Sequence, residues 1–119
     1  MDLEIKHIYS TDFDSYPEDT HRFNSSLYVE IGEKGKDGAE AFRFVVASPQ
    51  GLDLEVTSGE FKLLRGYILM AEFDWKLIYR AIENIINHTR SLTTWNEVIR
   101  YFNRYGIYDS EDLDGKFYP

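Results

Sequence analysis

The spacing of apolar residues changes once along this chain, from every second residue in the first half to every third or fourth residue later. Residues 27–31 and 42–46 place apolar side chains at alternate positions, which is typical of strands with one buried face. Residues 33–38 lie between them and contain an Asp-Gly pair, so a hairpin turn is expected there. A further short strand is expected within residues 3–9. The first half is therefore predicted to form paired strands.

Two later segments complete the strand prediction. Residues 10–22 are polar and acidic and are expected to form a loop, whereas residues 52–65 fit no single pattern. Residues 67–73 form a nearly continuous apolar run between Gly66 and Asp74. Such a run fits a fourth strand that is covered on both faces or placed centrally in the sheet.

The second half predicts two helices. Asp74 can cap the first helix, which is expected to run to about His88 along one apolar stripe. That stripe consists of Trp75, Ile78, Ile82, Ile85 and Ile86. Thr94 and Glu97 match a capping box that begins the second helix, and Gly106 is placed to end it with a left-handed cap. The expected inward residues of the second helix are Trp95, Val98, Ile99 and Phe102.

These elements predict an α+β fold, in which an antiparallel sheet of about four strands is followed by two helices packed on one face. The other face of the sheet is expected to be partly exposed. At 119 residues the chain has the length of one domain, and 43% of its residues are hydrophobic, which is enough for a core. We therefore expect a single domain over residues 1–119.

Composition narrows the functional classes. The chain has no cysteine, which excludes disulfides, thiolate metal ligands and cysteine nucleophiles. Asp2 and Glu4 stand where a secretory signal needs a basic start, and no apolar stretch approaches the length of a membrane span. We therefore expect a cytoplasmic protein without a membrane partner. The net charge of -8 argues against nucleic acid as a ligand, because phosphate binding depends on Lys and Arg.

The sequence contains no motif for catalysis or cofactor binding. His7, His21 and His88 are far apart, and none belongs to a zinc-binding pattern. No serine lies in a nucleophile elbow, and no glycine-rich turn leads into a helix with a lysine. The acidic run at residues 109–115 does not match a calcium loop. We therefore predict a protein that is not an enzyme and has no catalytic residues, no cofactor and no metal.

The net charge is unevenly distributed. All eight units lie in the first 21 and last 14 residues, while residues 22–105 carry 11 acidic and 11 basic residues. Charge outside a neutral middle is available to a basic partner, and tyrosines among acids suit a protein interface. The predicted partner-binding residues are Asp12, Asp14, Tyr16, Glu18, Asp19, Tyr108, Asp109, Glu111, Asp112 and Asp114. Either Tyr16 or Tyr108 would serve as the aromatic anchor. Alternatively, the acidic ends form solvated surfaces that maintain solubility.

Four segments follow one another in a fixed order: Phe42–Pro49, Glu72–Trp75, the helix with Ile78, Ile82 and Ile85, and Thr94–Val98. In these segments the chain resembles the immunity protein 8 family of bacterial polymorphic toxin systems. The resemblance implies an α+β cytoplasmic protein that binds and blocks a cognate toxin domain, and it implies no catalytic residues. The chain departs from the resemblance at Gln50–Leu52, where a bulkier continuation is expected, and in its acidic C-terminal end.

Two other functions remain open. An acidic adaptor that mimics the charge of nucleic acid would bind several basic proteins with a steep salt dependence. A small enzyme would need acids or histidines brought together only by the fold. An immunity protein would bind one toxin domain, and a nuclease toxin would present the basic cleft that holds phosphate. Gene order separates these functions, because an immunity gene is expected directly after a toxin gene.

Overall fold

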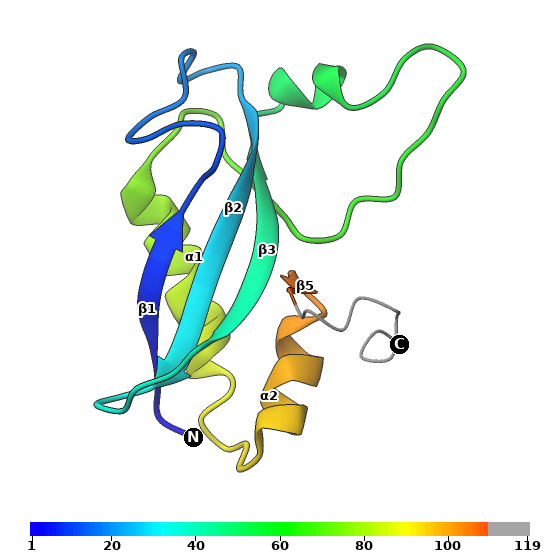
Figure 1. Ribbon diagram of the computed structural model, residues 1–119. Helices are drawn as coiled ribbons and strands as arrows, with labels where there is room; N and C mark the ends of the chain where they lie inside the picture. The colour runs from blue at the N-terminus through cyan, green and yellow to red at the C-terminus, as the bar shows by residue number, and fades with distance from the viewer. Residues whose placement is uncertain (110–119) are drawn as a thin grey trace.

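The structure is a computed structural model and describes residues 1–109. Within these residues, five strands form one sheet in the order β1-β2-β3-β4, with β5 beside β3. Figure 1 shows β1, β2 and β3 side by side, with α1 behind them. The elements are β1 (Leu3–Tyr9), β2 (Asn24–Glu33), β3 (Glu40–Ala47), the 3-10 helix η1 (Gly51–Leu54), β4 (Tyr67–Leu69), α1 (Trp75–Asn87), α2 (Trp95–Phe102) and β5 (Ile107–Tyr108). All pairs are antiparallel except β3 with β4, which is parallel. The α+β class and the mostly antiparallel sheet are therefore confirmed.

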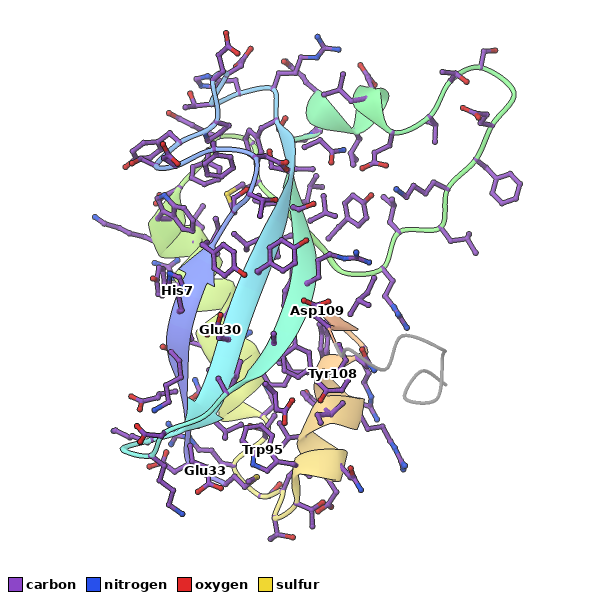
Figure 2. The ribbon with its side chains drawn as sticks, in the orientation of Figure 1. His7, Glu30, Glu33, Trp95, Tyr108 and Asp109 are labelled. Atoms are coloured by element: carbon purple, nitrogen blue, oxygen red, sulfur yellow. The ribbon has the colours of Figure 1, made fainter. Side chains whose placement is uncertain are left out.

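The hairpin of β2 and β3 forms as predicted. Its turn contains Gly35 and Gly38 at φ 77° and 92°, in the left-handed region that glycine adopts without strain. The residues of β2 that face the core are fully buried: Leu27, Val29 and Ile31. Glu30 lies between two of them, on the side of the sheet away from α1 (Figure 2). The sheet therefore has one buried face and one open face.

β1 is an edge strand whose apolar pattern changes partway along. Leu3 and Ile8 are both buried although they are an odd number of residues apart, which strict alternation would place on opposite faces. A register shift between Ile5 and His7 in the pairing with β2 brings Ile8 back to the core. The irregular spacing of this strand is therefore a bulge.

The fourth strand differs from the sequence prediction. β4 covers only three residues of the apolar run 67–73, lies at the edge of the sheet and leaves Leu69 57% exposed. The remaining residues leave the sheet, and the Phe73 N–H donates to the Thr20 carbonyl at 2.8 Å. The Phe73 ring packs edge-on against the rings of Phe13, Tyr16, Phe23 and Trp75. Met70 and Phe73 are buried in the core before α1. A fourth strand therefore forms as predicted, but the expected central position or cover on both faces was wrong.

Both helices begin at the predicted caps. The Asp74 carboxylate accepts a hydrogen bond from the Lys76 N–H at 2.8 Å at the start of α1. At the start of α2 the capping box is complete, because Thr94 Oγ1 accepts from the Glu97 N–H at 3.3 Å and the Glu97 carboxylate accepts from the Thr94 N–H at 3.1 Å. These side chains satisfy backbone donors that the first turn of a helix leaves unpaired.

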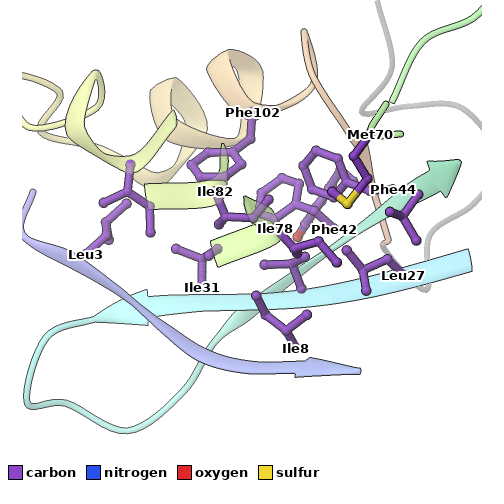
Figure 3. Close-up of a cluster of buried hydrophobic side chains, with 14 of the residues drawn as sticks. Leu3, Ile8, Leu27, Ile31, Phe42, Phe44, Met70, Ile78, Ile82 and Phe102 are labelled. Atoms are coloured by element: carbon purple, nitrogen blue, oxygen red, sulfur yellow. The ribbon is translucent and has the colours of Figure 1, made fainter. Parts of the chain in front are cut away.

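The core lies between the sheet and the two helices (Figure 3). Its largest fully buried apolar side chains come from both layers: Leu27, Val29, Ile31, Phe42, Phe44, Val46, Ile78, Ile82, Val98 and Phe102. The rings of Phe42 and Phe102 stack with their centroids 4.7 Å apart, which joins β3 to α2. Trp75 and Trp95 are partly buried and pack against this core. Both helices therefore pack on one face, as predicted.

The end of α2 differs from the prediction. The helix ends at Phe102, and Gly106 does not have a positive φ, so the left-handed cap expected there was wrong. Gly106 is instead required by close packing, because a Cβ at this position would lie 2.6 Å from the ring of Phe44. Asn103 Oδ1 accepts a hydrogen bond from the Tyr108 N–H at 2.7 Å, which fixes β5 beside β3.

We predict that Gly106→Ala lowers the free energy of unfolding by about 1–3 kcal/mol, because the added methyl group overpacks a filled core. Phe44→Leu in the same chain should recover part of this loss by making room for the methyl group. Denaturant unfolding of the wild type, both single variants and the double variant measures the coupling. A loss that is the same whether or not Phe44 is replaced would contradict the ring contact.

Candidate functional site

The open face of the sheet carries a row of aromatic and charged side chains. The strand register places Tyr9, Tyr28, Arg43 and Ile107 side by side across β1, β2, β3 and β5. The rings of Tyr9 and Tyr28 stack at 5.4 Å, and the His7 ring stacks on Tyr9 at 4.9 Å. This face is not covered by α1 or α2, so its side chains are available to a partner (Figure 2).

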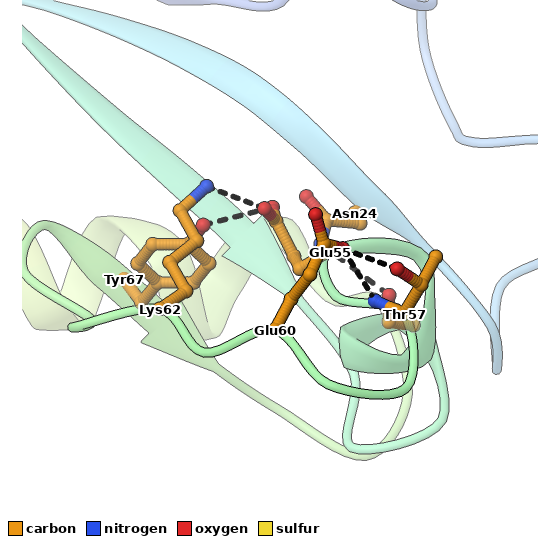
Figure 4. A network of polar contacts seen from close by, with 7 residues as sticks. Asn24, Glu55, Thr57, Glu60, Lys62 and Tyr67 are labelled. Atoms are coloured by element: carbon orange, nitrogen blue, oxygen red, sulfur yellow. Dashed lines mark hydrogen bonds and ion pairs between the residues drawn. The ribbon is translucent and has the colours of Figure 1, made fainter.

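A long segment between η1 and β4 projects beyond the sheet (Figure 1). We call this segment, together with Leu54 at the end of η1, the arm (residues 54–66). Its base is held by Glu55, whose carboxylate pairs with Lys62 and accepts a hydrogen bond from the Tyr67 hydroxyl at 2.8 Å (Figure 4). The hydrogen bond from Lys62 is the main cause that lowers the pKa of Glu55, and Glu55 in turn raises the pKa of Lys62. The arm is therefore anchored by a charged network.

An open hollow of about 560 Å³ lies between the arm and the open face. Arg43 of the sheet contributes to its lining together with Lys62 and Arg65 of the arm. Asp12 and Ile107 line the same hollow, so the loop before β2 and the strand β5 lie close to one another around it. The hollow combines both signs of charge with apolar side chains, a mixture that suits contact with another protein.

The predicted acidic loop, residues 10–22, is tied to the body of the protein. Asp12 accepts a hydrogen bond from the Ser26 N–H at 2.7 Å, and the Trp75 indole donates to the Ser15 carbonyl at 2.6 Å. Asp19 accepts from two backbone N–H groups near the end of the loop, and these hydrogen bonds, first that of His21, lower its pKa. The loop therefore holds its acids in defined positions.

The four acids of this loop have two different roles. Asp12 and Asp19 bond backbone amides, so they shape the loop itself. Asp14 and Glu18 are exposed, and their side chains form no hydrogen bond or ion pair with any residue in 1–109. Charges that form no contact within the fold are available to a partner. Substitutions at Asp14 and Glu18 can therefore test partner binding without disturbing the loop.

The two predicted aromatic anchors lie in different surroundings. Tyr16 is 60% exposed, and its ring meets Phe73 edge-on at 5.8 Å. Tyr108 is buried, packs against the ring of Phe42 and donates from its hydroxyl to Glu40 at 2.6 Å. Of the two tyrosines, Tyr16 is therefore the one with free surface for a partner.

The predicted C-terminal acids are described only in part. Asp109 is exposed, and its N–H donates to the Ala41 carbonyl at 2.8 Å, which extends the pairing of β5 with β3. Because Tyr108 faces the core, the alternation of the strand directs Asp109 to the open face. Glu111, Asp112 and Asp114 lie outside the described residues.

The acidic loop and Asp109 share the open side of the sheet without forming one acidic surface. Asp12 is bonded to Ser26 of β2, and Asp109 is bonded to Ala41 of β3, which pairs with Glu30 of β2. These two rows of paired residues are four residues apart, about 13 Å along the strands. Arg43 lies between those rows, so a basic side chain stands between the two groups of acids. The sites are close enough to contact one partner, whose surface would have to match this alternation of charge.

The arm is the feature that sequence reasoning missed. Phe61, Leu63 and Leu64 lie in the segment that fits no single pattern, between Gly59 and Gly66. Apolar residues that lie between glycines and lack helical or strand periodicity indicate a segment that forms neither a core helix nor a core strand. This pattern does not show that the side chains are exposed.

No curated protein and no solved structure matches this chain. The family model described as Immunity protein 8 matches residues 2–113, which include every described element from β1 to β5. The chain belongs to the immunity protein 8 family. The resemblance carried by β3, the start of α1 and the capping box of α2 is thereby confirmed. Immunity protein 8 members act in toxin systems, where a cognate toxin is the partner of the immunity protein.

Immunity proteins are generally not enzymes. Within residues 1–109, no helix has the length and apolar character needed to cross a membrane. No three His, Asp or Glu side chains in the same residues are grouped so that they could hold a metal ion. The departure noted at Gln50–Leu52 has a steric reason, because a Cβ on Gly51 would lie 1.8 Å from the Phe23 carbonyl oxygen.

We predict that Glu55→Gln loosens the arm without changing the sheet. The substitution removes the charge that holds Lys62, so amide hydrogen exchange over residues 57–66 should become several-fold faster, while β2 and β3 keep their protection. Glu30→Gln on the open face makes the same change of charge outside the network and should leave the arm unchanged. Equal exchange in the arm of both variants would contradict the anchoring role.

The same network predicts a pH dependence. The pKa of Glu55 is lowered in the folded protein, so its stabilisation is complete above the ordinary glutamate pKa and is lost as the pH falls through the lowered value. The Lys62 and Tyr67 resonances should therefore shift together at a pH below the ordinary glutamate range. An NMR titration measures this transition, and a midpoint above the ordinary glutamate pKa would contradict the prediction.

Proposed function

We propose that this immunity protein binds and neutralises its cognate toxin domain by direct protein-protein contact, without catalysis, as a single cytoplasmic domain over residues 1–119. The match of the family to residues 2–113 is the observation that carries the proposal. The toxin domain is proposed to be basic, and a nuclease with a phosphate-binding cleft would meet this requirement. Nucleic acid and membranes are not proposed as partners.

The acids outside the neutral middle of the chain support a basic partner. Asp14 and Glu18 stand on a loop that is fixed to the body, so a partner would find their charges already in position. Opposite charge on the partner would raise the association rate and would disfavour the wrong partners. We propose that this loop contacts the toxin through Asp12, Asp14, Tyr16, Glu18 and Asp19, together with Asp109 and the C-terminal acids Glu111, Asp112 and Asp114.

The alternative of an acidic adaptor that imitates nucleic acid has less support. Such an imitation needs a continuous line of negative charge at the spacing of phosphates. Arg43 stands between the acids on the open side of the sheet, and Arg65 lines the hollow beside it. An alternating surface favours selection of one partner over general binding of basic proteins.

Calorimetric titration tests the proposed function. The full chain is titrated with the toxin domain encoded directly upstream, at two salt concentrations. Tight binding of one copy to one toxin domain, weakened at the higher salt, is the expected result. Absence of binding would overturn the proposal, and similar affinity for unrelated basic proteins would favour the adaptor.

We predict that the double variant Asp14→Lys, Glu18→Lys lowers toxin affinity by about tenfold to a hundredfold, mostly through slower association. The control is Asp37→Lys, Glu83→Lys, which changes the net charge equally on the β2–β3 turn and on α1, away from the acidic loop. The control should change affinity less than threefold. Equal losses in both variants would mean that net charge, and not the acidic loop, determines binding.

A further inference from the structure

The arm exposes large apolar side chains to an unusual degree. Leu54 and Leu64 are 61% and 51% exposed, and Phe61 and Leu63 reach 86% and 87%, the highest values among the large apolar residues in 1–109. Single exposed apolar side chains are ordinary on protein surfaces, whereas several on one short segment mark an interaction site. The arm therefore has the composition of a contact surface.

The arm is held to the body of the protein at both of its ends. Glu55 joins Lys62 and Tyr67 at the base of the arm, and the Val45 N–H donates to the Gly66 carbonyl at 2.7 Å where the arm returns to β3. Within the arm, the Thr57 N–H donates to the Glu60 carboxylate at 2.9 Å. A segment held at both ends loses less conformational freedom on binding, which increases the affinity of its exposed side chains for a partner.

The arm begins beside the acidic loop. Leu54 lines an open hollow of about 330 Å³ together with Asp12, Glu18 and Asp19. Apolar side chains at the centre with charged residues around them are the usual arrangement of a protein interface. The negative charge beside the arm selects a positively charged partner. A second copy of this chain on the same surface would bring two acidic loops together, which like-charge repulsion disfavours.

We propose that the arm is the apolar centre of the toxin-binding surface, with Phe61 and Leu63 as its anchors and the acidic loop as its charged border. This inference rests on the proposed function and adds the surface that performs it. Because the arm projects from the body, its partner surface is concave: an apolar-walled cleft in a basic domain (Figure 1). A small number of buried anchors carries most of the affinity in such interfaces.

The test measures binding kinetics of single variants with the upstream toxin domain. Phe61→Ala and Leu63→Ala should each raise the dissociation rate at least tenfold and leave the salt dependence of association unchanged. The matched controls are Tyr79→Ala and Leu77→Ala, which truncate exposed apolar side chains of α1 and should change the dissociation rate less than threefold. All four side chains are exposed, so denaturant midpoints near that of the wild type confirm that the variants fold.

The outcomes separate the two proposals. If the wild type binds and the arm variants dissociate at its rate, the inference fails and the proposed function stands. If the wild type does not bind, both fail. Two further experiments test other occupants of the arm.

Sedimentation of the free protein tests whether a second copy of this chain binds the arm. A dimer that Phe61→Ala converts to a monomer would show that it does, and would overturn the inference. Hydrogen exchange tests whether the C-terminal end of the same chain binds the arm. Faster exchange in the arm of the Phe117→Ala, Tyr118→Ala variant would show that it does, and would also overturn the inference.

Discussion

The two helices pack against one face of the β2–β3 hairpin and bury it. This packing determines which side chains face the core and where the other strands lie. The stacked rings of Phe42 and Phe102 join the layers, and the alternation of the strands then directs every second side chain outward. β3 is also the strand that both β4 and β5 pair with along its second edge. Because β4 is parallel to β3 and pairs with its last three residues, the chain must turn back past the end of β3 before it enters β4, and a two-residue turn cannot make this connection. In most parallel pairs a helix makes the connection, whereas here η1 and the arm make it, and the apolar side chains of the arm stay exposed.

The charges of the chain fall into those that hold the fold and those that it leaves unused. Glu55 with Lys62 fixes the arm, and Asp12 with Asp19 fixes the acidic loop. Asp14 and Glu18 have no such role within residues 1–109, so formal charge alone does not show which acids also shape the fold. The proposed binding surface would combine a rigid frame with an apolar centre and a small number of oriented charges, a combination that gives both affinity and partner selection.

Local signals predicted local structure well. The hairpin, the cap at Asp74 and the capping box at Thr94 depend on neighbours within a few residues, and all of them form as the sequence indicates. The prediction failed where distant contacts decide. The apolar run after Gly66 reads as a central strand, but its aromatic ring at Phe73 is held by a cluster drawn from the loop before β2. Gly106 is placed where a left-handed cap would be expected, but glycine is needed there because the ring of Phe44, far away in sequence, leaves no room for a Cβ. For the same reason the sequence shows which acids lie outside the neutral middle of the chain, while the exposure of the arm between η1 and β4 could not be predicted from it.

A hydrogen-exchange footprint of the complex with the toxin domain would show which side of this protein the toxin covers. We propose that the arm lies at the centre of the covered surface and the acidic loop at its border. We expect that binding slows exchange over residues 10–22 and 54–66 and leaves the exposed side of α1 unchanged. Protection along α1 with no change in the arm would contradict it.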